Sequence, residues 1–307
     1  MFKGILYALA ACFVWGLIFV VPMFMTDYTP VEVALGRYVT YGALSLLIFF
    51  KSRCRYPKTI WIKATLYSFV YTMGYYLCVV LALRLSSPAI CALILGLSPI
   101  AIAFYGNWQE KEISNKSLIV PSLLTLLGLI LINIPGLQSA ASPTTYVWGL
   151  FFGALALIGW SWYVVANSRF LKKQPLVDSS EWATLIGVTC LVWVALFGLF
   201  FGLFFPEQFS LHKCLTFSPD FVIGSLVLGV ISAWLGYYFW NKASLHLPIS
   251  LAGQLTIFET IFGVIFFYMI EMKMPPLLEC IGILLFLGAI TYGVSQFSTI
   301  SMRKKTI

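Results

Sequence analysis

The sequence predicts an all-α polytopic membrane protein with about ten transmembrane helices, arranged as two inverted five-helix repeats around a central cavity. Three observations lead to this prediction: the composition, a series of apolar runs of spanning length, and an internal repeat. Of the 307 residues, 61% are hydrophobic and 10% are charged, and the mean hydropathy is +0.94. A soluble domain carries about 25% charged residues and cannot keep so much apolar surface out of water. The composition therefore excludes a soluble enzyme, a disordered tail and a secreted disulfide scaffold.

Apolar runs mark the helices, because a transmembrane helix needs about 20 predominantly apolar residues. Proline, glycine and clusters of charge mark the breaks between them. The runs predict spans at residues 4–25, 31–50, 60–83, 88–108, 117–135, 144–168, 181–205, 219–240, 249–270 and 276–297. The first run continues from Lys3 to Met25, which is too long for the apolar core of a signal peptide, so we expect it to be the first span.

The basic residues favour one orientation of these spans. With a cytoplasmic N-terminus and alternating loops, fifteen of the 19 Lys and Arg residues lie on the cytoplasmic side, three lie outside, and Arg37 lies within a span. Cytoplasmic loops of membrane proteins are enriched in Lys and Arg. The distribution predicts that both termini are cytoplasmic, and it accounts for the net charge of +8 without a nucleic-acid partner.

The chain also repeats itself, which predicts two halves. Gly74–Tyr76 in the third span recurs as Gly236–Tyr238 in the eighth, and the interval from Pro99 to Glu110 equals that from Thr260 to Glu271. An odd number of spans in each half forces opposite orientations in the bilayer, which is the inverted-repeat plan of secondary transporters. We therefore expect an N-terminal repeat at 1–140 and an inverted C-terminal repeat at 141–307, the latter with a short basic tail.

Several short motifs, in this order, carry a resemblance to a known family: Trp15-Gly16 with Phe19, Thr29-Pro30 before Arg37, Tyr75-Tyr76, Ser98-Pro99, the loop 110–114, Asn241-Lys242-Ala243 and Ser250-Leu251-Ala252. The chain resembles the EamA-type permeases of the drug/metabolite transporter superfamily over essentially its whole length. The resemblance implies a cavity lined mainly by the first, third, fourth, sixth, eighth and ninth spans, and export or exchange of small metabolites, often amino acids. The chain departs from the family at Thr260, where the ninth span usually carries a proline.

Glu259 is the most informative single residue, because it lies near the middle of an apolar run. A charged carboxylate there costs about 2.5–3.5 kcal/mol on insertion scales, so it is expected to face a partner or a wet cavity. Ala252, Thr256 and Gly263 share its helical face and leave room for a ligand. We interpret Glu259 as a residue that binds a substrate ammonium, takes up a coupling proton, or does both; the alternative is a structural acid between helices.

Arg37 in the second span allows two interpretations. Its guanidinium could anchor a substrate carboxylate, because the two groups match in a bidentate arrangement. Alternatively, it could reach the outer interface or pair with Glu32 or Asp27.

Aromatic and amide side chains repeat at helical spacing and supply the remaining candidates. Tyr67, Tyr71 and Tyr75 form a stripe on the third span. A mid-helix Tyr or Trp needs a partner for its polar tip, whereas many other rings belong to packing or to interfacial belts. The candidate cavity walls are Trp15, Tyr75, Tyr76, Trp160, Tyr163, Tyr237 and Tyr238. The candidate polar contacts are Ser98, Asn167, Asn241 and Gln254.

These residues predict a secondary active transporter of the bacterial inner membrane that exports or exchanges amino acids, with apolar and aromatic zwitterions favoured, or related small metabolites, by alternating access. The alternative is a proton-coupled exporter of drugs or cationic metabolites, since an acid among rings also holds a cation. An intramembrane enzyme would need a catalytic dyad or a metal, and a scramblase or channel would need a continuous polar path. We expect no catalytic residue, no cofactor and no metal site; the expected partners are a small-molecule substrate, a proton as coupling ion and membrane lipids, in a monomer or homodimer.

Overall fold

The computed structural model describes residues 1–52, 56–86, 88–133, 143–174 and 177–303, and within these ranges every regular element is helical. Ten of the helical stretches are long and apolar enough to cross a membrane. They are Phe2–Phe24, Pro30–Lys51, Lys58–Leu85, Ile90–Glu110, Asn115–Asn133, Tyr146–Lys173, Ser179–Phe204, Pro219–His246, Ile249–Glu271 and Leu277–Ser298. The predicted all-helical membrane protein with ten spans is therefore confirmed, and the first apolar run is a helix of spanning length.

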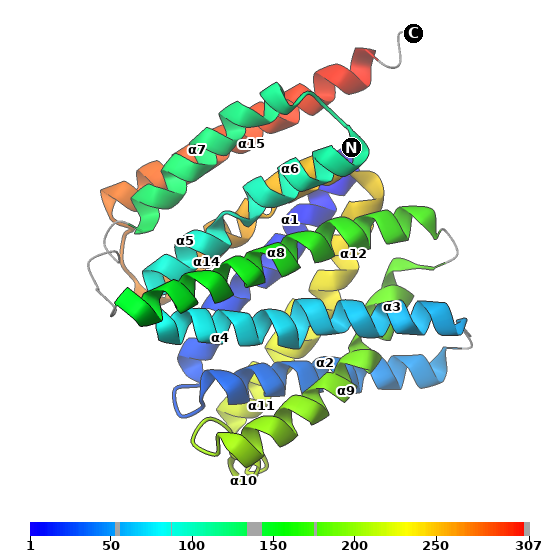
Figure 1. The fold of residues 1–307 in the computed structure, drawn as a ribbon, viewed down its shortest axis with the longest axis vertical. Helices are drawn as coiled ribbons and strands as arrows, with labels where there is room; N and C mark the ends of the chain where they lie inside the picture. The colour runs from blue at the N-terminus through cyan, green and yellow to red at the C-terminus, as the bar shows by residue number, and fades with distance from the viewer. Residues whose placement is uncertain (53–55, 87, 134–142, 175–176, 304–307) are drawn as a thin grey trace.

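The helices of the first five spans are α1 (Phe2–Gly16), α2 (Pro30–Lys51), α3 (Lys58–Phe69), α4 (Tyr75–Leu85), α5 (Pro88–Gly96), α6 (Ser98–Glu110) and α7 (Asn115–Asn133). Those of the last five are α8 (Pro143–Lys173), α9 (Ser179–Phe204), α11 (Pro219–Leu226), α12 (Gly236–His246), α13 (Ile249–Leu255), α14 (Ile257–Glu271) and α15 (Leu277–Arg303), with the short α10 (Leu211–Cys214) between α9 and α11. In Figure 1, α1 begins and α15 ends toward the same side of the bundle.

The start of α2 shows how local sequence fixes a helix end. Thr29 accepts a hydrogen bond from the Glu32 amide, and the Glu32 carboxylate accepts one from the Thr29 amide, which completes a capping box. Pro30 occupies the first helical position, where its missing N–H is not needed. The Glu32 carboxylate therefore serves to cap the N-terminal end of α2.

The third and eighth spans share an irregularity. A π-helical segment, η3 (Val70–Gly74), joins α3 to α4, and a second one, η5 (Val227–Leu235), joins α11 to α12. Each of them leads directly into one of the two Gly-Tyr-Tyr sequences: Gly74 ends η3, and Gly236 begins α12. π-Helical turns are rare in proteins overall, but those that occur are often at functional sites. The two segments therefore direct attention to the tyrosines that follow them.

The fourth and ninth spans are both interrupted. The break between α5 and α6 falls at Leu97, and that between α13 and α14 at Thr256. The ninth span is therefore interrupted without a proline, and the Thr256 hydroxyl donates to the Gly253 carbonyl at the break. The break also divides the helical face that the sequence assigns to Glu259. Both spans end at a residue in the left-handed region, Lys111 with φ 48° and Met272 with φ 52°.

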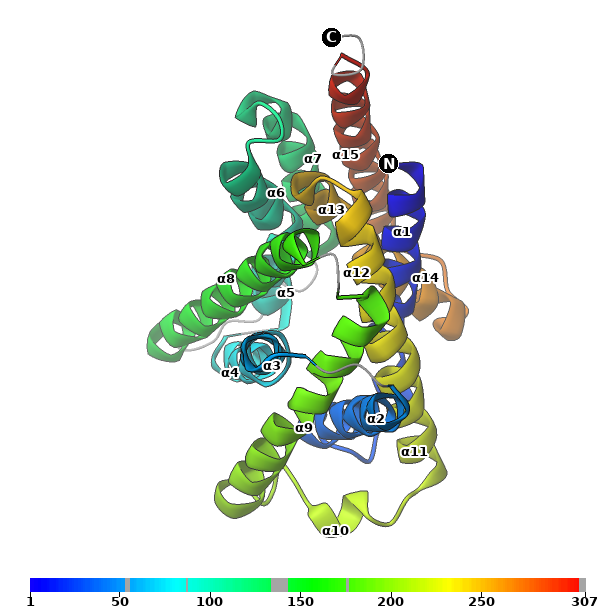
Figure 2. The same ribbon diagram turned by 90° about the vertical axis from the view of Figure 1, so that its right-hand side faces the viewer.

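Helices of the first five spans pack against helices of the last five spans. The main pairs are α7 with α15, α2 with α9, α4 with α8, α1 with α12, and α6 with α13. Figures 1 and 2 show α7 beside α15 and α2 beside α9. The buried core runs between these pairs and includes Trp15, Tyr71, Tyr163 and Trp240.

The crossing of α2 and α9 depends on Gly187. A Cβ atom added there would lie 2.0 Å from the Ser45 hydroxyl oxygen and 2.9 Å from the Tyr41 ring, whereas one at Gly198 of the same helix would lie 3.8 Å from Phe209. We expect Gly187→Ala to lower the free energy of unfolding by about 1–3 kcal/mol through overpacking, and Gly198→Ala to raise it by up to about 1 kcal/mol through helix propensity. Unfolding in mixed micelles, followed by circular dichroism, measures both; equal stability of the two variants would contradict this account of the crossing.

Candidate functional site

Five of the predicted residues form one cluster of rings where four spans meet. The Trp15 ring lies 6.1 Å from that of Trp160 and 5.8 Å from that of Tyr237, measured between centroids. Trp160 lies 5.7 Å from Tyr75 and 5.8 Å from Tyr163. Aromatic pairs at these separations attract each other in tilted or edge-to-face arrangements. The first, third, sixth and eighth spans thus contribute to one group of contacting rings, which we call the ring cluster: Trp15, Tyr75, Trp160, Tyr163 and Tyr237.

Three further buried rings pack against the ring cluster and are not among the predicted site residues. Tyr71 lies 4.6 Å from Tyr163 and 4.5 Å from Tyr237, and Trp240 lies 5.4 Å from Trp15. Tyr41 lies 5.7 Å from Tyr237. The stripe of tyrosines on the third span indicated Tyr71. Tyr41 comes from the second span, and no sequence pattern linked it to the others.

Glu259 and Arg37 interact electrostatically with each other and with tyrosines in and around the ring cluster. Glu259 occupies the first turn of α14, where the positive end of the helix dipole favours a carboxylate. Its charge also acts on Tyr75 and on Cys12. Arg37 interacts in the same way with Tyr71 and Tyr237, so the two charges share one environment.

The alternative pairing of Arg37 with Glu32 is wrong. Glu32 caps α2, lies 3.4 Å from the Lys213 ammonium and accepts a hydrogen bond from the Ser210 amide, all at the end of the bundle where α2 begins. The Arg37 Nε atom is buried and has no hydrogen-bond partner in the described part of the chain.

Asn167 and Asn241 bind each other instead of standing free beside the rings. The Asn167 amide nitrogen donates to the Asn241 side-chain oxygen at 3.0 Å, and the Trp182 indole donates to Asn167 at 2.7 Å. Asn241 in turn donates to the Ser179 carbonyl at 3.2 Å. All of these groups are buried, so the amides tie α8, α9 and α12 together.

Removing one amide of this network should cost stability. Asn167→Ala leaves the Trp182 indole and the Asn241 oxygen buried without their partner, and each stranded group costs about 1–3 kcal/mol. We therefore expect a loss of about 2–4 kcal/mol in the free energy of unfolding. A double-mutant cycle with Asn241→Ala should show a coupling of at least about 0.5 kcal/mol. Strictly additive losses would contradict the pairing.

The remaining predicted residues lie elsewhere or make other contacts. Gln254 is buried against Gly293 of α15, where a Cβ atom would come within 1.8 Å of its side-chain oxygen, and neither of its amide atoms has a partner among the described residues. Tyr238 stacks on Trp234 at 6.1 Å, with the Lys242 ammonium over its ring. The Tyr76 hydroxyl is buried without a partner in the described structure, and Ser98 begins α6 at the break of the fourth span.

Polar contacts join several helices at the end of the bundle where α1 begins. The Glu112 carboxylate accepts hydrogen bonds from the Ile249 and Ser250 amides at 2.6 and 2.8 Å, at the start of α13. Glu110 lies 2.7 Å from Arg169, and Lys172 donates to the Leu247 carbonyl at 2.8 Å. We call these contacts, together with the amide network, the inner lock.

An ion pair between Asp178 and Lys242 at 3.1 Å borders the inner lock. Burial raises the pKa of the Asp178 carboxyl, but hydrogen bonds from Ser180 and Lys242 outweigh it and lower the pKa to about 2. A lowered folded-state pKa means that this contact is present above the ordinary aspartate pKa and is lost as the pH falls toward 2. It is therefore intact at any physiological pH.

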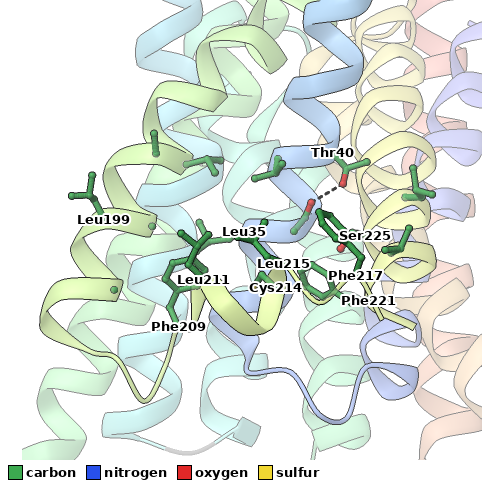
Figure 3. Close-up of a pocket in the computed structure, with 18 of the residues that line it drawn as sticks. Leu35, Thr40, Leu199, Phe209, Leu211, Cys214, Leu215, Phe217, Phe221 and Ser225 are labelled. Carbon is green, nitrogen blue, oxygen red and sulfur yellow. Dashed lines mark hydrogen bonds between the residues drawn. The ribbon is translucent and has the colours of Figure 1, made fainter. Parts of the chain in front are cut away.

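A cavity of about 740 Å³ lies away from the ring cluster, between α2, α9, α10 and α11 (Figure 3). Its lining includes Leu35, Leu199, Phe209 and Phe221, and contains no charged side chain among the described residues. Such a lining suits hydrocarbon and not a zwitterion. No predicted site residue lines it, and in the described ranges no group of three His, Cys, Asp or Glu side chains could hold a metal ion.

Comparison with known proteins identifies the chain's relatives. The model of the EamA-like transporter family matches residues 2–134. This segment is an EamA-like transporter domain. It belongs to the drug/metabolite transporter superfamily, as the motifs predicted. The family is one of transporters, which speaks against an enzyme.

Two proteins and a solved structure are similar to longer stretches of the chain. The chain is homologous to the inner membrane protein YtfF of Escherichia coli, with 28% identity over 96% of this chain and 95% of that protein. It is 24% identical to the uncharacterized transporter YyaM of Bacillus subtilis, over 52% of this chain and 49% of that protein. A solved crystal structure aligns with a TM-score of 0.79 over 97% of this chain and 98% of its own, at 18% identity, which shows the shared fold. These findings support a transporter in the inner membrane.

Proposed function

We propose that this protein is a secondary active transporter that exports or exchanges amino acids, with apolar and aromatic zwitterions favoured, or related small metabolites, across the bacterial inner membrane. One observation carries the proposal: aromatic side chains from four spans converge within the helical bundle, and the Glu259 carboxylate interacts electrostatically with one of them, Tyr75. An ionisable residue inside a membrane protein usually marks a substrate or ion pathway.

The chemistry of the ring cluster fits an amphiphilic molecule. Trp160 and Tyr75 are partly exposed, so a bound molecule can reach their faces, whereas Trp15, Tyr163 and Tyr237 are buried behind them. Rings offer an apolar surface for a side chain, and a few polar groups fix the orientation of the ligand. Glu259, which is also partly exposed, supplies a group that binds an ammonium.

Alternating access through two inverted repeats is part of the proposal, and the packing of the helices supports it. If each half is the counterpart of the other, the contact of α1 with α12 corresponds to that of α8 with α4, and both pairs pack closely. The π-helical segments before the two Gly-Tyr-Tyr sequences, the breaks in the fourth and ninth spans, and the left-handed Lys111 and Met272 fall at matching places. Two such halves can rock against each other around a site between them.

Burial differs between the inner lock and the ring cluster, and this difference supports a proposal about the side from which substrate enters. Around the inner lock, Asn167, Asn241 and Ser250 are buried, whereas Tyr75, Trp160 and Glu259 keep part of their surface exposed. With both termini cytoplasmic, as the basic residues predict, the inner lock closes the cytoplasmic side. We infer that the substrate reaches the ring cluster from outside in this conformation.

Counterflow in sealed vesicles tests the proposed function. Vesicles that contain the purified protein are loaded with one unlabelled amino acid and then exposed to the same labelled amino acid outside. An exchanger accelerates uptake into loaded vesicles over unloaded ones, whereas a channel only equilibrates the label. Protein-free vesicles are the control. The absence of acceleration with every common amino acid would contradict the proposed substrate class.

A further inference from the structure

Arg37 and Glu259 bring opposite charges to the ring cluster from different halves of the chain. Arg37 lies on α2 and Glu259 on α14, and both sit within spans. Each interacts electrostatically with the other and with tyrosines of the surrounding rings. Two charges of opposite sign leave this part of the membrane interior without net charge.

The two groups do not contact each other directly. The ion pairs within 4 Å among the described residues join Arg169 to Glu110, Lys213 to Glu32, Lys242 to Asp178 and Lys273 to Glu271. Arg37 and Glu259 belong to none of them, and the Arg37 Nε atom is buried without a partner in the described structure. A buried donor without a partner is costly, so the arrangement leaves a hydrogen-bonding requirement that a ligand can satisfy.

We infer that Arg37 and Glu259 together bind the two charged groups of a zwitterion, with the carboxylate at Arg37 and the ammonium at Glu259, while the ring cluster contacts the apolar remainder. This inference rests on the proposed function and deepens it, because it assigns the anion subsite and makes the site select by charge. A zwitterion bound to both residues gives each of them a charge-assisted hydrogen bond.

Selection follows from the charge of the loaded site. A zwitterion leaves the site neutral, whereas a simple cation adds one positive charge beside Arg37 and a simple anion adds one negative charge beside Glu259. An uncompensated charge is expensive in the membrane interior. The site therefore discriminates against the cationic drugs and metabolites that an acid among rings would otherwise hold.

Binding of three matched probes tests this inference. Phenylalanine, phenethylamine and 3-phenylpropanoate share one ring and differ in their charged groups, so their affinities for purified protein in detergent isolate the charge. We expect the wild-type protein to bind phenylalanine at least about tenfold more tightly than either other probe, since a charge-assisted hydrogen bond corresponds to about a tenfold to hundredfold change in affinity. Arg37→Gln should prefer the amine, and Glu259→Gln should prefer the carboxylate. Arg84→Gln, at an exposed arginine of α4, is the matched control and should keep the wild-type order.

Thermal unfolding of the same variants separates binding from folding. Each single neutralisation should lower the melting temperature because it leaves one buried charge uncompensated, and the double variant Arg37→Gln/Glu259→Gln should recover part of the loss. If the two losses in melting temperature simply added in the double variant, the inferred coupling between Arg37 and Glu259 would be overturned. Unchanged probe order in both single variants, or equal loss of all three probes, would overturn the zwitterion site. A wild-type protein that binds none of the probes would also overturn it, while counterflow with the other amino acids decides separately whether the proposed function stands.

Discussion

Replacing Glu112 by glutamine should open the end of the bundle at which α1 begins and raise the modification rate of Cys12 at least about tenfold. The Glu112 carboxylate accepts two backbone hydrogen bonds at the start of α13, and hydrogen bonds to a charged group contribute about 1.5–3 kcal/mol each. About 1.4 kcal/mol changes an equilibrium tenfold. Cys12 reports the opening, because it is buried and its thiol donates to the Leu255 carbonyl of α13.

The measurement follows reaction with a small thiol reagent in protein whose other six cysteines have been replaced. Glu110→Gln is the matched control, because the Glu110–Arg169 pair has about a third of each side chain exposed and exposed pairs contribute about 1 kcal/mol or less. Equal modification rates in the wild-type protein and Glu112→Gln would contradict the assignment of Glu112 to the inner lock. Equal effects of the two variants would show that charge alone, and not the bond to α13, is responsible.

Trp15→Ala should produce the largest loss of stability, about 3–5 kcal/mol in the free energy of unfolding. Trp15 is 2% exposed and contacts the rings of Trp160, Tyr237 and Trp240. Its indole nitrogen has no partner in the described structure, so the substitution strands no hydrogen bond and the loss measures packing alone. Trp15→Phe should recover most of it, because a ring remains at the junction of α1, α8 and α12.

Trp148→Ala is the control for this substitution. Trp148 is 56% exposed on α8, and surface substitutions change stability by about 0.5 kcal/mol or less. Unfolding of both variants in mixed micelles gives the comparison. A loss below about 1 kcal/mol for Trp15→Ala would mean that the ring cluster does not hold the two halves of the chain together.

The spans and much of the ring cluster could be predicted from the sequence, because both depend on local pattern. An apolar run of spanning length leaves few alternatives to a transmembrane helix. For this reason each of the ten predicted spans corresponds to one of the ten helical stretches of the structure. Trp15, Tyr75, Trp160, Tyr163 and Tyr237 were found because a polar ring in the middle of an apolar helix needs an interior environment.

Contacts between distant spans could not be predicted in the same way. Glu112 stands in a charged loop, and only the approach of α6 to α13 makes it a cap for the ninth span. Asn167 and Asn241 fit a polar cavity wall by spacing, yet they satisfy each other because α8 and α12 meet there. Likewise, the environment of Arg37 depends on which helices of the opposite half surround α2, and no pattern along the chain carries that information.

The π-helical segment Val70–Gly74 changes the direction in which the tyrosine side chains after it leave the third span. A hydrogen bond from residue i to i+5 encloses one residue more than the α-helical bond, and each residue of an α-helix turns the following side chains by about 100°. We therefore expect the Tyr75 side chain to point about a quarter-turn away from the direction that the regular spacing of Tyr67 and Tyr71 would give it. The angular position of a ring in the site is thus fixed by an extra backbone residue that never has to touch a ligand, and shortening this segment by one residue would re-aim every side chain beyond it.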